Sequence, residues 1–446
     1  MSDLKEIIIN VKIFGAKGDG ITDDTVTIQN AVNTSSRDGG TIHFPSGTYM
    51  VNALTSIILK SNLRLLLDKN ATIKAINNGS SAYSIFRIEN INNVCIEDGT
   101  IIGDKTTHAG NTGEWGRCFY ILGSSNITLK NLTIKDAWGD CITIGGDVIN
   151  EKIIIDNCII DNARRNGITV AHAKNVDIKN TVVKNTSGTA PTAGIDIEPD
   201  IGDYVGNIII SNCYVHNNLG NGIIVAFDAQ KVNITNVFAY SNGGAGIAVD
   251  GNETRRGKEV IIQNCHAYDN TRGVYLEYAV DTHIINCHTH HNLTDGIQDV
   301  FGIGNTIESN NSNYNSSNGI SLLSTIRSTV LTNMVYGNFL HGIRVAGGVI
   351  NTETSILNNK TIANATQNIS LTNMSYGLVS GNYVRKGMGT SVSKTGINFI
   401  ASVTNTMLMN NDCYDGGSDI GISTGGSNTM NGGNRNKDGT FTTNPN

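Results

Sequence analysis

The chain of 446 residues lacks the features that mark membrane-spanning and nucleic-acid-binding proteins. No segment approaches the roughly 18 consecutive apolar residues that a membrane-spanning helix requires. No basic run occurs and the formal net charge is -6, which argues against a nucleic-acid partner. Residues 1–10 lack the basic-then-apolar pattern of a signal peptide. We therefore expect an extracellular or virion-associated protein that leaves by a route such as virus assembly and lysis. The alternatives are action inside the cell, or a signal missing from this sequence.

Proline and charged residues are also scarce, whereas glycine is abundant. Four prolines, 16% charged residues and 50 glycines suit a chain of short strands and tight bends. The eight cysteines form no Cys-x-x-Cys metal pattern. Four of the cysteines occupy the same position in units of the repeat that is described below: Cys158, Cys213, Cys265 and Cys287. We expect them to be small, inward-facing core residues without disulfides.

A glycine followed by an aliphatic residue recurs every 23 to 28 residues along most of the chain. The positions are Gly167, Gly194, Gly222, Gly246, Gly273, Gly296, Gly319 and Gly342. A near-constant period in this range indicates a solenoid with one supersecondary unit per repeat. The apolar runs between the glycines are short and β-branched, as in residues 153–155 and 208–210, which excludes helical repeats. The pattern predicts an all-β fold, a parallel β-helix with three short strands per coil.

A column of asparagines precedes the glycines by nine or ten residues. Its members are Asn131, Asn157, Asn212, Asn236, Asn264, Asn286 and Asn333. We interpret this column as an internal ladder in which each side-chain amide bonds the next at a bend.

The first 51 residues predict a cap on the solenoid. We expect residues 22–24 to cap a helix whose apolar face is Ile28, Ala31 and Val32. This helix would cover the open edge of the first coil. The patterns FGAKGDGITDD and GGTIHFPSGTY in this segment resemble the entry cap of the pectate-lyase-like superfamily of right-handed parallel β-helices. That superfamily includes polygalacturonases, phage tailspike depolymerases and mannuronan C5-epimerases. We expect a capping segment at residues 1–51, a parallel β-helix at 52–428 and a loosely held polar tail at 429–446.

An early coil carries a long excursion, residues 103–116, followed by a second acidic loop. Insertions on a solenoid map to loops on one face, often the binding face. The chain's two tryptophans, Trp115 and Trp138, both fall here. They serve either as sugar-stacking platforms or as core residues that anchor the loops. Asp140 ends the second loop and is a further candidate contact to the substrate.

Acidic side chains enter the predicted wall at residues 194–200, Gly-Ile-Asp-Ile-Glu-Pro-Asp. Alternation after the repeat glycine places Thr143, Thr169 and Asp196 in one outward column, and Glu198 in the next. Asp250 falls in the same column as Glu198, two coils later, and the small residues Ala226 and Ala248 between the acidic side chains predict an open groove. The candidate catalytic residues are therefore Asp196, Glu198 and Asp250. A calcium site or a solvated acidic patch is the alternative, and we otherwise expect no cofactor.

Further candidates for substrate binding lie on the coils around residues 194–200. They are Arg164, Arg165, His172, Asp228, Tyr275 and Glu277, and each is also interpretable as a solvated side chain on a turn. Another set of outward residues follows the asparagine column. It comprises Tyr214, His216, Phe238, Tyr240, His266, Tyr268, His288 and His290. We predict that this aromatic stripe mediates self-association, as a homotrimer, with glycan stacking or a metal site as alternatives.

Paired carboxyl groups predict hydrolysis of glycosidic bonds. Residues two apart on a strand lie about 6.7 Å apart at the backbone, which favours the wider carboxyl separation of inverting enzymes. We assign Glu198 as the acid and Asp196 as the base, or the reverse. A lyase or C5-epimerase acting on uronates is the alternative, with Arg164, Arg165 and His172 as candidates. The resemblance to epimerases aligns their aspartate with Asp196 but their tyrosine with Ala193. The polygalacturonase motifs are missing. We therefore predict a tailspike-like hydrolase, and the alternative is a non-catalytic glycan-binding or structural β-helix.

Overall fold

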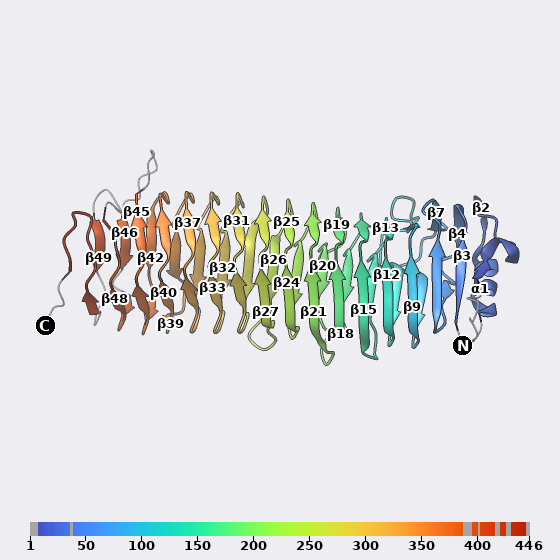
Figure 1. Cartoon of the computed structure of the whole chain (residues 1–446), viewed down its shortest axis with the longest axis horizontal. Helices are drawn as coiled ribbons and strands as arrows, with labels where there is room; N and C mark the ends of the chain where they lie inside the picture. The colour runs from blue at the N-terminus through green and yellow to red at the C-terminus, as the bar shows by residue number, and fades with distance from the viewer. Residues whose placement is uncertain are drawn as a thin grey trace, which may run out of the picture. The chain divides into compact units, whose positions relative to one another are not determined.

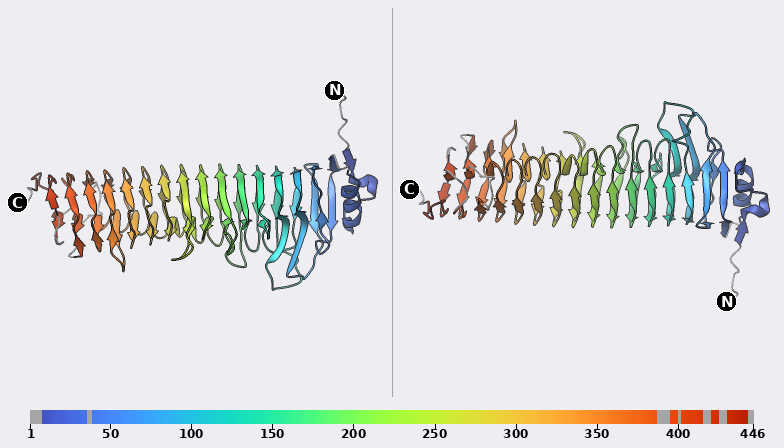
Figure 2. Two further views of the ribbon diagram at one scale, coloured as in Figure 1. Left: turned by 90° about the horizontal axis from the view of Figure 1, so that it is seen from below. Right: turned by 90° about the horizontal axis from the view of Figure 1, so that it is seen from above.

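The computed structural model describes residues 8–35, 39–386, 395–399, 402–414, 420–424 and 430–442. Two compact units divide the chain, Met1–Ile224 (unit 1) and Val225–Asn446 (unit 2). In both units, strands from successive coils stack in parallel register (Figure 1, Figure 2). The prediction of an all-β parallel β-helix is confirmed.

The segment before the solenoid contains the predicted helix. Strand β1 (Ile8–Asn10), the 3-10 helix η1 (Val11–Phe14) and β2 (Asp19–Asp23) precede α1 (Thr25–Thr34), which buries Ile28, Ala31 and Val32. Asp23 Oδ1 accepts from the backbone N–H of Thr25, the first residue of α1, at 3.0 Å, whereas the carboxylate of Asp24 does not cap the helix. The Asp24 carboxylate accepts hydrogen bonds from the backbone N–H groups of Lys17 and Gly18 at 2.7 and 3.0 Å, and so closes the glycine-rich turn.

The described residues of unit 1 form three parallel sheets. The first contains β1, β3 (Gly40–Phe44), β6 (Leu63–Leu67), β9 (Asn92–Glu97), β12 (Ser125–Lys130), β15 (Asn150–Asp156), β18 (Ala173–Lys179) and β21 (Val205–Ser211). The second contains β2, β4 (Gly47–Val51), β7 (Ala71–Ala75), β10 (Thr100–Ile102), β13 (Thr133–Lys135), β16 (Ile159–Asp161), β19 (Val182–Lys184) and β22 (Tyr214–His216). The third contains β5 (Ile57–Ile58), β8 (Ala82–Glu89), β11 (Trp115–Leu122), β14 (Ile142–Gly145), β17 (Ile168–Val170) and β20 (Ile195–Ile197). Strand β23 (Ile223–Ala226) spans the division between the units.

Unit 2 repeats this arrangement. Its first sheet contains β24 (Gln230–Thr235), β27 (Lys258–Gln263), β30 (His283–Ile285), β33 (Thr306–Glu308), β36 (Thr329–Leu331), β40 (Ser355–Leu357), β44 (Leu378–Ser380), β48 (Met407–Met409) and β50 (Met430–Gly432). The second contains β25 (Phe238–Tyr240), β28 (His266–Tyr268), β31 (His288–His290), β34 (Asn311–Asn313), β37 (Met334–Tyr336), β41 (Lys360–Ile362) and β45 (Tyr383–Arg385). The third contains β26 (Ala245–Asp250), β29 (Arg272–Glu277), β32 (Ile297–Val300), β35 (Ile320–Leu323), β38 (Ile343–Ala346), β42 (Gln367–Leu371), β46 (Thr395–Phe399) and β49 (Ile420–Thr424). A small sheet contains β39 (Asn351–Thr352), β43 (Met374–Ser375) and β47 (Val403–Thr404).

Alternation along each strand fills the core with aliphatic side chains. Ile153 and Ile155 on β15 are fully buried, while Ile154 between them faces outward. The repeat glycines occur where adjacent coils approach most closely. A Cβ at Gly194 would lie 2.6 Å from the carbonyl oxygen of Gly222, and one at Gly273 would lie 2.3 Å from that of Gly296. Only glycine fits such a column without displacing a backbone.

The internal asparagine ladder exists, but not at the predicted column. Asn157 has a φ of 53° and lies on the exposed side, where its Nδ2 donates to Asn131 Oδ1 at 2.9 Å. Asparagine tolerates this left-handed backbone, which turns its side chain outward. Of the predicted column, Asn333 alone is buried; its Nδ2 donates to Asn359 Oδ1 at 3.0 Å. The buried ladders of unit 2 run through Asn310, Asn333, Asn359, Asn382, Asn411 and Asn434, and through Asn270, Asn292, Asn315, Asn338 and Asn364.

The four cysteines of the repeat are buried free thiols, as predicted: Cys158, Cys213, Cys265 and Cys287. Of the segment expected to be a loose tail, residues 429 and 443–446 lie outside the described residues. In the remainder, β50 pairs with β48 and Asn434 Nδ2 donates to the carbonyl oxygen of Leu408 at 2.8 Å. No helix among the described residues is long and apolar enough to cross a membrane.

Candidate functional site

The candidate site lies on the third sheet of unit 1. Parallel register aligns Thr143 on β14 with Thr169 on β17 and with Asp196 on β20, so the predicted outward column is present. The expected open groove is absent at this column, because Thr143, Thr169 and Asp196 are only 5%, 6% and 1% exposed. Side chains from neighbouring loops cover this part of the wall, and sequence alternation could not reveal that covering.

Asp140 is the anchor of the site and is fully buried. Its carboxylate accepts hydrogen bonds from Thr143 Oγ1 at 3.1 Å, Thr169 Oγ1 at 2.9 Å and the backbone N–H of Asn166 at 3.0 Å. Arg165 Nη1 donates to it at 3.1 Å. These donors engage both oxygens of Asp140, so its role is to fix the position of Arg165 and Asn166, not to contact a substrate directly.

Asp196 differs from Asp140 in that it is incompletely hydrogen-bonded. Asn166 Nδ2 donates to Asp196 Oδ2 at 2.7 Å, whereas Oδ1 is buried and has no hydrogen-bond partner among the described residues. Burial, and after it the negative charge of Glu198, raises the pKa of Asp196 to about 8, although Arg165 opposes this shift. Asp196 therefore carries a proton at neutral pH, beside a half-buried Glu198 whose charge helps to retain it.

Arg165 joins the acidic groups to the exposed rim of the site. Burial alone would lower the pKa of Arg165, but Asp140 and Asp196 outweigh burial and raise it. The guanidinium also lies 3.7 Å from Glu114 and 5.0 Å from the centroid of the Trp115 ring. Trp115 is 39% exposed and lies at the edge of the site.

Arg117 and Asn166 belong to this cluster, and the sequence analysis missed both. The Arg117 guanidinium lies 4.8 Å from the ring centroid of Trp115 and 4.0 Å from that of Tyr120, and its Nε donates to Thr143 Oγ1 at 3.1 Å. Asn166 directly precedes the repeat glycine Gly167, and that position was the available signal. Nothing in the sequence distinguished Arg117 from other charged residues of the wall.

Trp138 is a loop anchor and not a sugar-stacking platform. Its ring is sandwiched between His108 at 3.9 Å and the Arg164 guanidinium at 4.0 Å, and the residue is 8% exposed. His108 Nδ1 lies 3.0 Å from Asp104 Oδ2, with both side chains fully buried. Arg164 and Trp138 therefore hold the excursion of residues 103–116, which protrudes from unit 1 (Figure 2).

His172 occupies the turn after β17. Its Nδ1 lies 2.8 Å from the carbonyl oxygen of Gly146 and 3.4 Å from Asp203 Oδ1. No hydrogen bond or ion pair among the described residues joins His172 to Asp196.

Unit 2 holds the other predicted residues. Asp250 accepts from the N–H of Gly251 at 2.7 Å; burial raises its pKa, and Glu277 adds to this shift. Tyr275 donates its hydroxyl to Glu277 at 2.7 Å, so these three residues form one cluster on β26 and β29. Asp228 is paired with Arg255 at 2.8 Å. The predicted pairing of Asp250 with Asp196 joins different units and stays a prediction.

The aromatic stripe is present in unit 2 as a stack of rings. Phe238 and His266 are stacked with centroids 4.7 Å apart and an interplanar angle of 10°. Tyr240 and Tyr268 are 5.0 Å apart at 6°, and Tyr268 and His290 are 4.9 Å apart at 3°. Rings that stack on one another along the coils present their edges to solvent, which argues against glycan stacking on their faces. Among the described residues, no group of three or more His, Cys, Asp or Glu side chains is arranged to hold a metal ion.

Comparison with known proteins agrees with this fold. Residues 8–91 match the family model "Rhamnogalacturonase A/epimerase, pectate lyase-like", and residues 201–354 match "Right handed beta helix region". The recognition of a pectate-lyase-like, right-handed parallel β-helix is thus confirmed.

Individual relatives match parts of the chain. The uncharacterized protein YclG of Bacillus subtilis is 33% identical over 224 residues, which are 44% of this chain and 38% of that protein. Mannuronan C5-epimerase AlgE2 of Azotobacter vinelandii is 24% identical over 293 residues, 60% of this chain and 26% of the enzyme. The structure of gene product 12 of bacteriophage phi29 superposes with a TM-score of 0.70 and 15% identity, covering 98% of this chain and 75% of that one. The chain thus spans well under half of the length of either matched relative, and the phage structure supports the fold alone.

Proposed function

We propose that this chain, a right-handed parallel β-helix of the pectate-lyase-like superfamily, binds a polysaccharide and hydrolyses its glycosidic bonds. The similarity to a mannuronan C5-epimerase supports a polysaccharide as the substrate class. The 26% identity over 237 residues to the pre-neck appendage protein of Bacillus phage phi29 agrees with a virion-associated or extracellular protein, and we take the depolymerase to be of the tailspike type. Assembly as a homotrimer belongs to the same proposal.

The observation that carries hydrolysis is the state of the two carboxyl groups on the β20 wall. Hydrolysis needs one protonated and one ionised carboxyl group on either side of the scissile bond. Asp196, with a pKa of about 8, supplies the proton, and Glu198, whose charge raises that pKa, supplies the ionised group. This assigns Asp196 as the general acid and Glu198 as the base, the reverse of the first sequence assignment. Their backbone spacing of about 6.7 Å favours the inverting geometry.

Access to Asp196 requires a change in the rim of the site. Asp196 is 1% exposed, and the Arg165 guanidinium lies between Asp140, Glu114 and the Trp115 ring. We expect the substrate to displace Arg165 from Glu114, the longer of its two ion pairs, at 3.7 Å against 3.1 Å. A sugar hydroxyl or carboxylate then replaces Glu114 as the partner of Arg165, while Asp140 keeps the arginine close to the reacting bond.

A lyase or C5-epimerase is the second candidate, and the epimerase relative favours it. Such an enzyme needs a base for the C5 proton and a cation beside the uronate carboxylate. The raised pKa of Arg165 suits the second role and opposes the first, because a base must release its proton. His172 is held by Gly146 and Asp203, and within the described part of the chain no hydrogen bond or ion pair links it to Asp196, so nothing favours it as that base.

Digestion of a panel of bacterial and plant polysaccharides tests the proposal, with reducing ends and ultraviolet absorbance followed together. Hydrolysis releases reducing ends without the absorbance of an unsaturated uronate, and Asp196→Asn and Glu198→Gln abolish the release. New absorbance means a lyase. Proton exchange at C5 without chain cleavage means an epimerase. Binding with no reaction, unchanged in Asp196→Asn, favours the rival glycan-binding or structural β-helix.

A further inference from the structure

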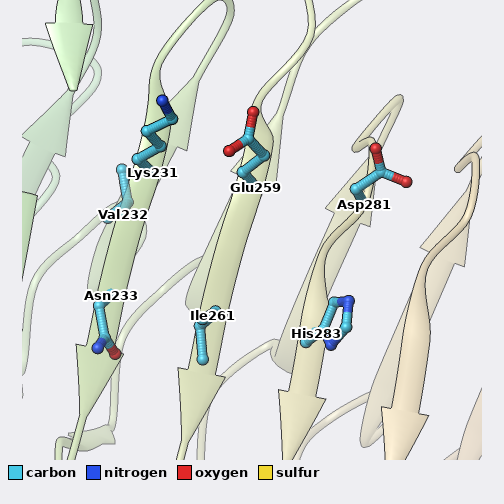
Figure 3. Close-up of a pocket in the computed structure, with 7 residues that line it drawn as sticks. All are labelled: Lys231, Val232, Asn233, Glu259, Ile261, Asp281 and His283. Atoms are coloured by element: carbon cyan, nitrogen blue, oxygen red, sulfur yellow. The ribbon is translucent and has the colours of Figure 1, made fainter. Parts of the chain in front are cut away.

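A pocket of about 410 Å³ lies in unit 2, on the outer face of its first sheet. In-register residues on three neighbouring strands form its lower row: Asn233 on β24, Ile261 on β27 and His283 on β30 (Figure 3). The upper row consists of Lys231, Glu259 and Asp281. No residue of this pocket takes part in the proposed hydrolysis, and the sequence analysis singled out none of them.

The polar side chains of the pocket have little hydrogen bonding with the described part of the chain. Among the described residues, Lys231, Glu259, Asp281 and His283 form no side-chain hydrogen bond or ion pair. Asn233 Oδ1 is covered and likewise has no hydrogen-bond partner. This differs from the neighbouring exposed column of the same wall, where Asn286 Nδ2 donates to Asn264 Oδ1 at 2.7 Å.

The apolar surface of the pocket comes from Ile261, which is 39% exposed at the centre of the lower row. Val232, on β24 between Lys231 and Asn233, is only 1% exposed. A wall that alternates apolar and polar groups in this way suits a pyranose ring, which offers an apolar face and a rim of hydroxyl groups. The volume is at the lower end of the range for small-molecule sites, about 300–1,000 Å³, and so fits a single sugar unit.

The charges narrow the choice of sugar. Two carboxylates, those of Glu259 and Asp281, line the pocket together with one ammonium group, that of Lys231. An additional carboxylate would be repelled by this set, while a hydroxyl, acetamido or ammonium group finds acceptors in it.

We propose that this pocket is a saccharide-binding subsite for an uncharged or amino-sugar unit of a polysaccharide, separate from the reacting site of unit 1. The inference rests on the proposed function in that it takes a polysaccharide as the ligand. Such a subsite would add a binding contact for the polymer on unit 2.

The test uses a glycan array of bacterial surface polysaccharides that carry neutral, amino or uronate units. The probe is the fluorescently labelled full-length chain with Asp196→Asn, which prevents cleavage. Ile261→Glu in this background removes the apolar centre and adds a third carboxylate. Met407→Glu is the matched control, because Met407 is 37% exposed and occupies the same outward column five coils beyond His283.

We expect signals on glycans with neutral or amino units. Ile261→Glu should weaken them on the order of tenfold, the loss expected for removing one partly buried aliphatic contact, and Met407→Glu should leave them unchanged. Signals that persist in Ile261→Glu, or that occur only on uronate glycans, overturn the subsite and leave the proposed hydrolysis standing. Absence of any signal, together with no reducing-end release by the wild type, overturns both.

Discussion

Asp299 provides a quantitative test of the core of unit 2. It lies on β32 between Leu276 and Leu322 of the adjacent coils and is fully buried. Its oxygens accept from Asn305 Nδ2 at 3.1 Å and from Ser328 Oγ at 3.2 Å. Burial outweighs these hydrogen bonds and raises the pKa of Asp299 from 3.8 to about 7. The carboxyl group is therefore neutral in the folded core under mildly acidic conditions.

The sign of the resulting pH dependence follows from linkage. The folded chain retains the Asp299 proton up to about pH 7, while the unfolded chain releases it near pH 4. The stabilisation is thus complete below the unfolded pKa and is lost as the pH rises to the folded pKa. A difference of about three pKa units corresponds to about 4 kcal/mol in the free energy of unfolding. Asp299→Asn keeps the shape of the side chain, with its oxygen placed to accept from Asn305 Nδ2 and its amide nitrogen placed to donate to Ser328 Oγ. It cannot ionise, so it should not show this loss.

The measurement is the chemical denaturation of both proteins at several pH values, followed by circular dichroism. The stability advantage of Asp299→Asn should grow by about 4 kcal/mol between about pH 4 and about pH 8. Asp269→Asn is the control, because Asp269 is exposed at a left-handed turn position that asparagine also tolerates. Parallel pH dependences for the wild type and Asp299→Asn would refute the raised pKa of Asp299.

Three further predictions follow from the same contacts. Asp196→Asn should lower kcat by about 10²–10⁴-fold while substrate binding persists. Wild-type activity should fall above about pH 8, because Asp196 loses its proton there. A wild-type pH–rate profile without that alkaline fall would contradict the role of Asp196 as the acid. Gly194→Ala should destabilise unit 1 by about 1–3 kcal/mol, since its Cβ would lie 2.6 Å from the carbonyl oxygen of Gly222. Gly145→Ala is the control, because its Cβ would meet only ordinary contacts. Equal melting temperatures of these two variants would contradict the close approach at Gly194. Light scattering should give three times the chain mass of 47.6 kDa, and a monomer would exclude the homotrimer.

The sequence alone determined the architecture. The glycine period, the short β-branched runs and the cap motif identified a pectate-lyase-like parallel β-helix, because each coil repeats the same local requirements. The same spacing placed Asp196 in register with Thr169, and placed Cys158 inside the core. Strand alternation and close backbone approach are properties of short segments, so they are encoded where they act.

The tertiary structure decided what surrounds those positions. Asp196 was expected in an open groove, but Arg165 and the rim of the excursion cover it, and that burial gives the raised pKa. Trp138 became a loop anchor because His108, thirty residues earlier in the sequence, stacks on it. The buried asparagine ladder through Asn333 lies one residue after the repeat position of Asn157, because the left-handed bend turns Asn157 toward solvent. Burial, pKa shifts and ring stacking arise from contacts between the coils and the loops that extend from them. A periodic sequence pattern does not specify which loop folds over which coil.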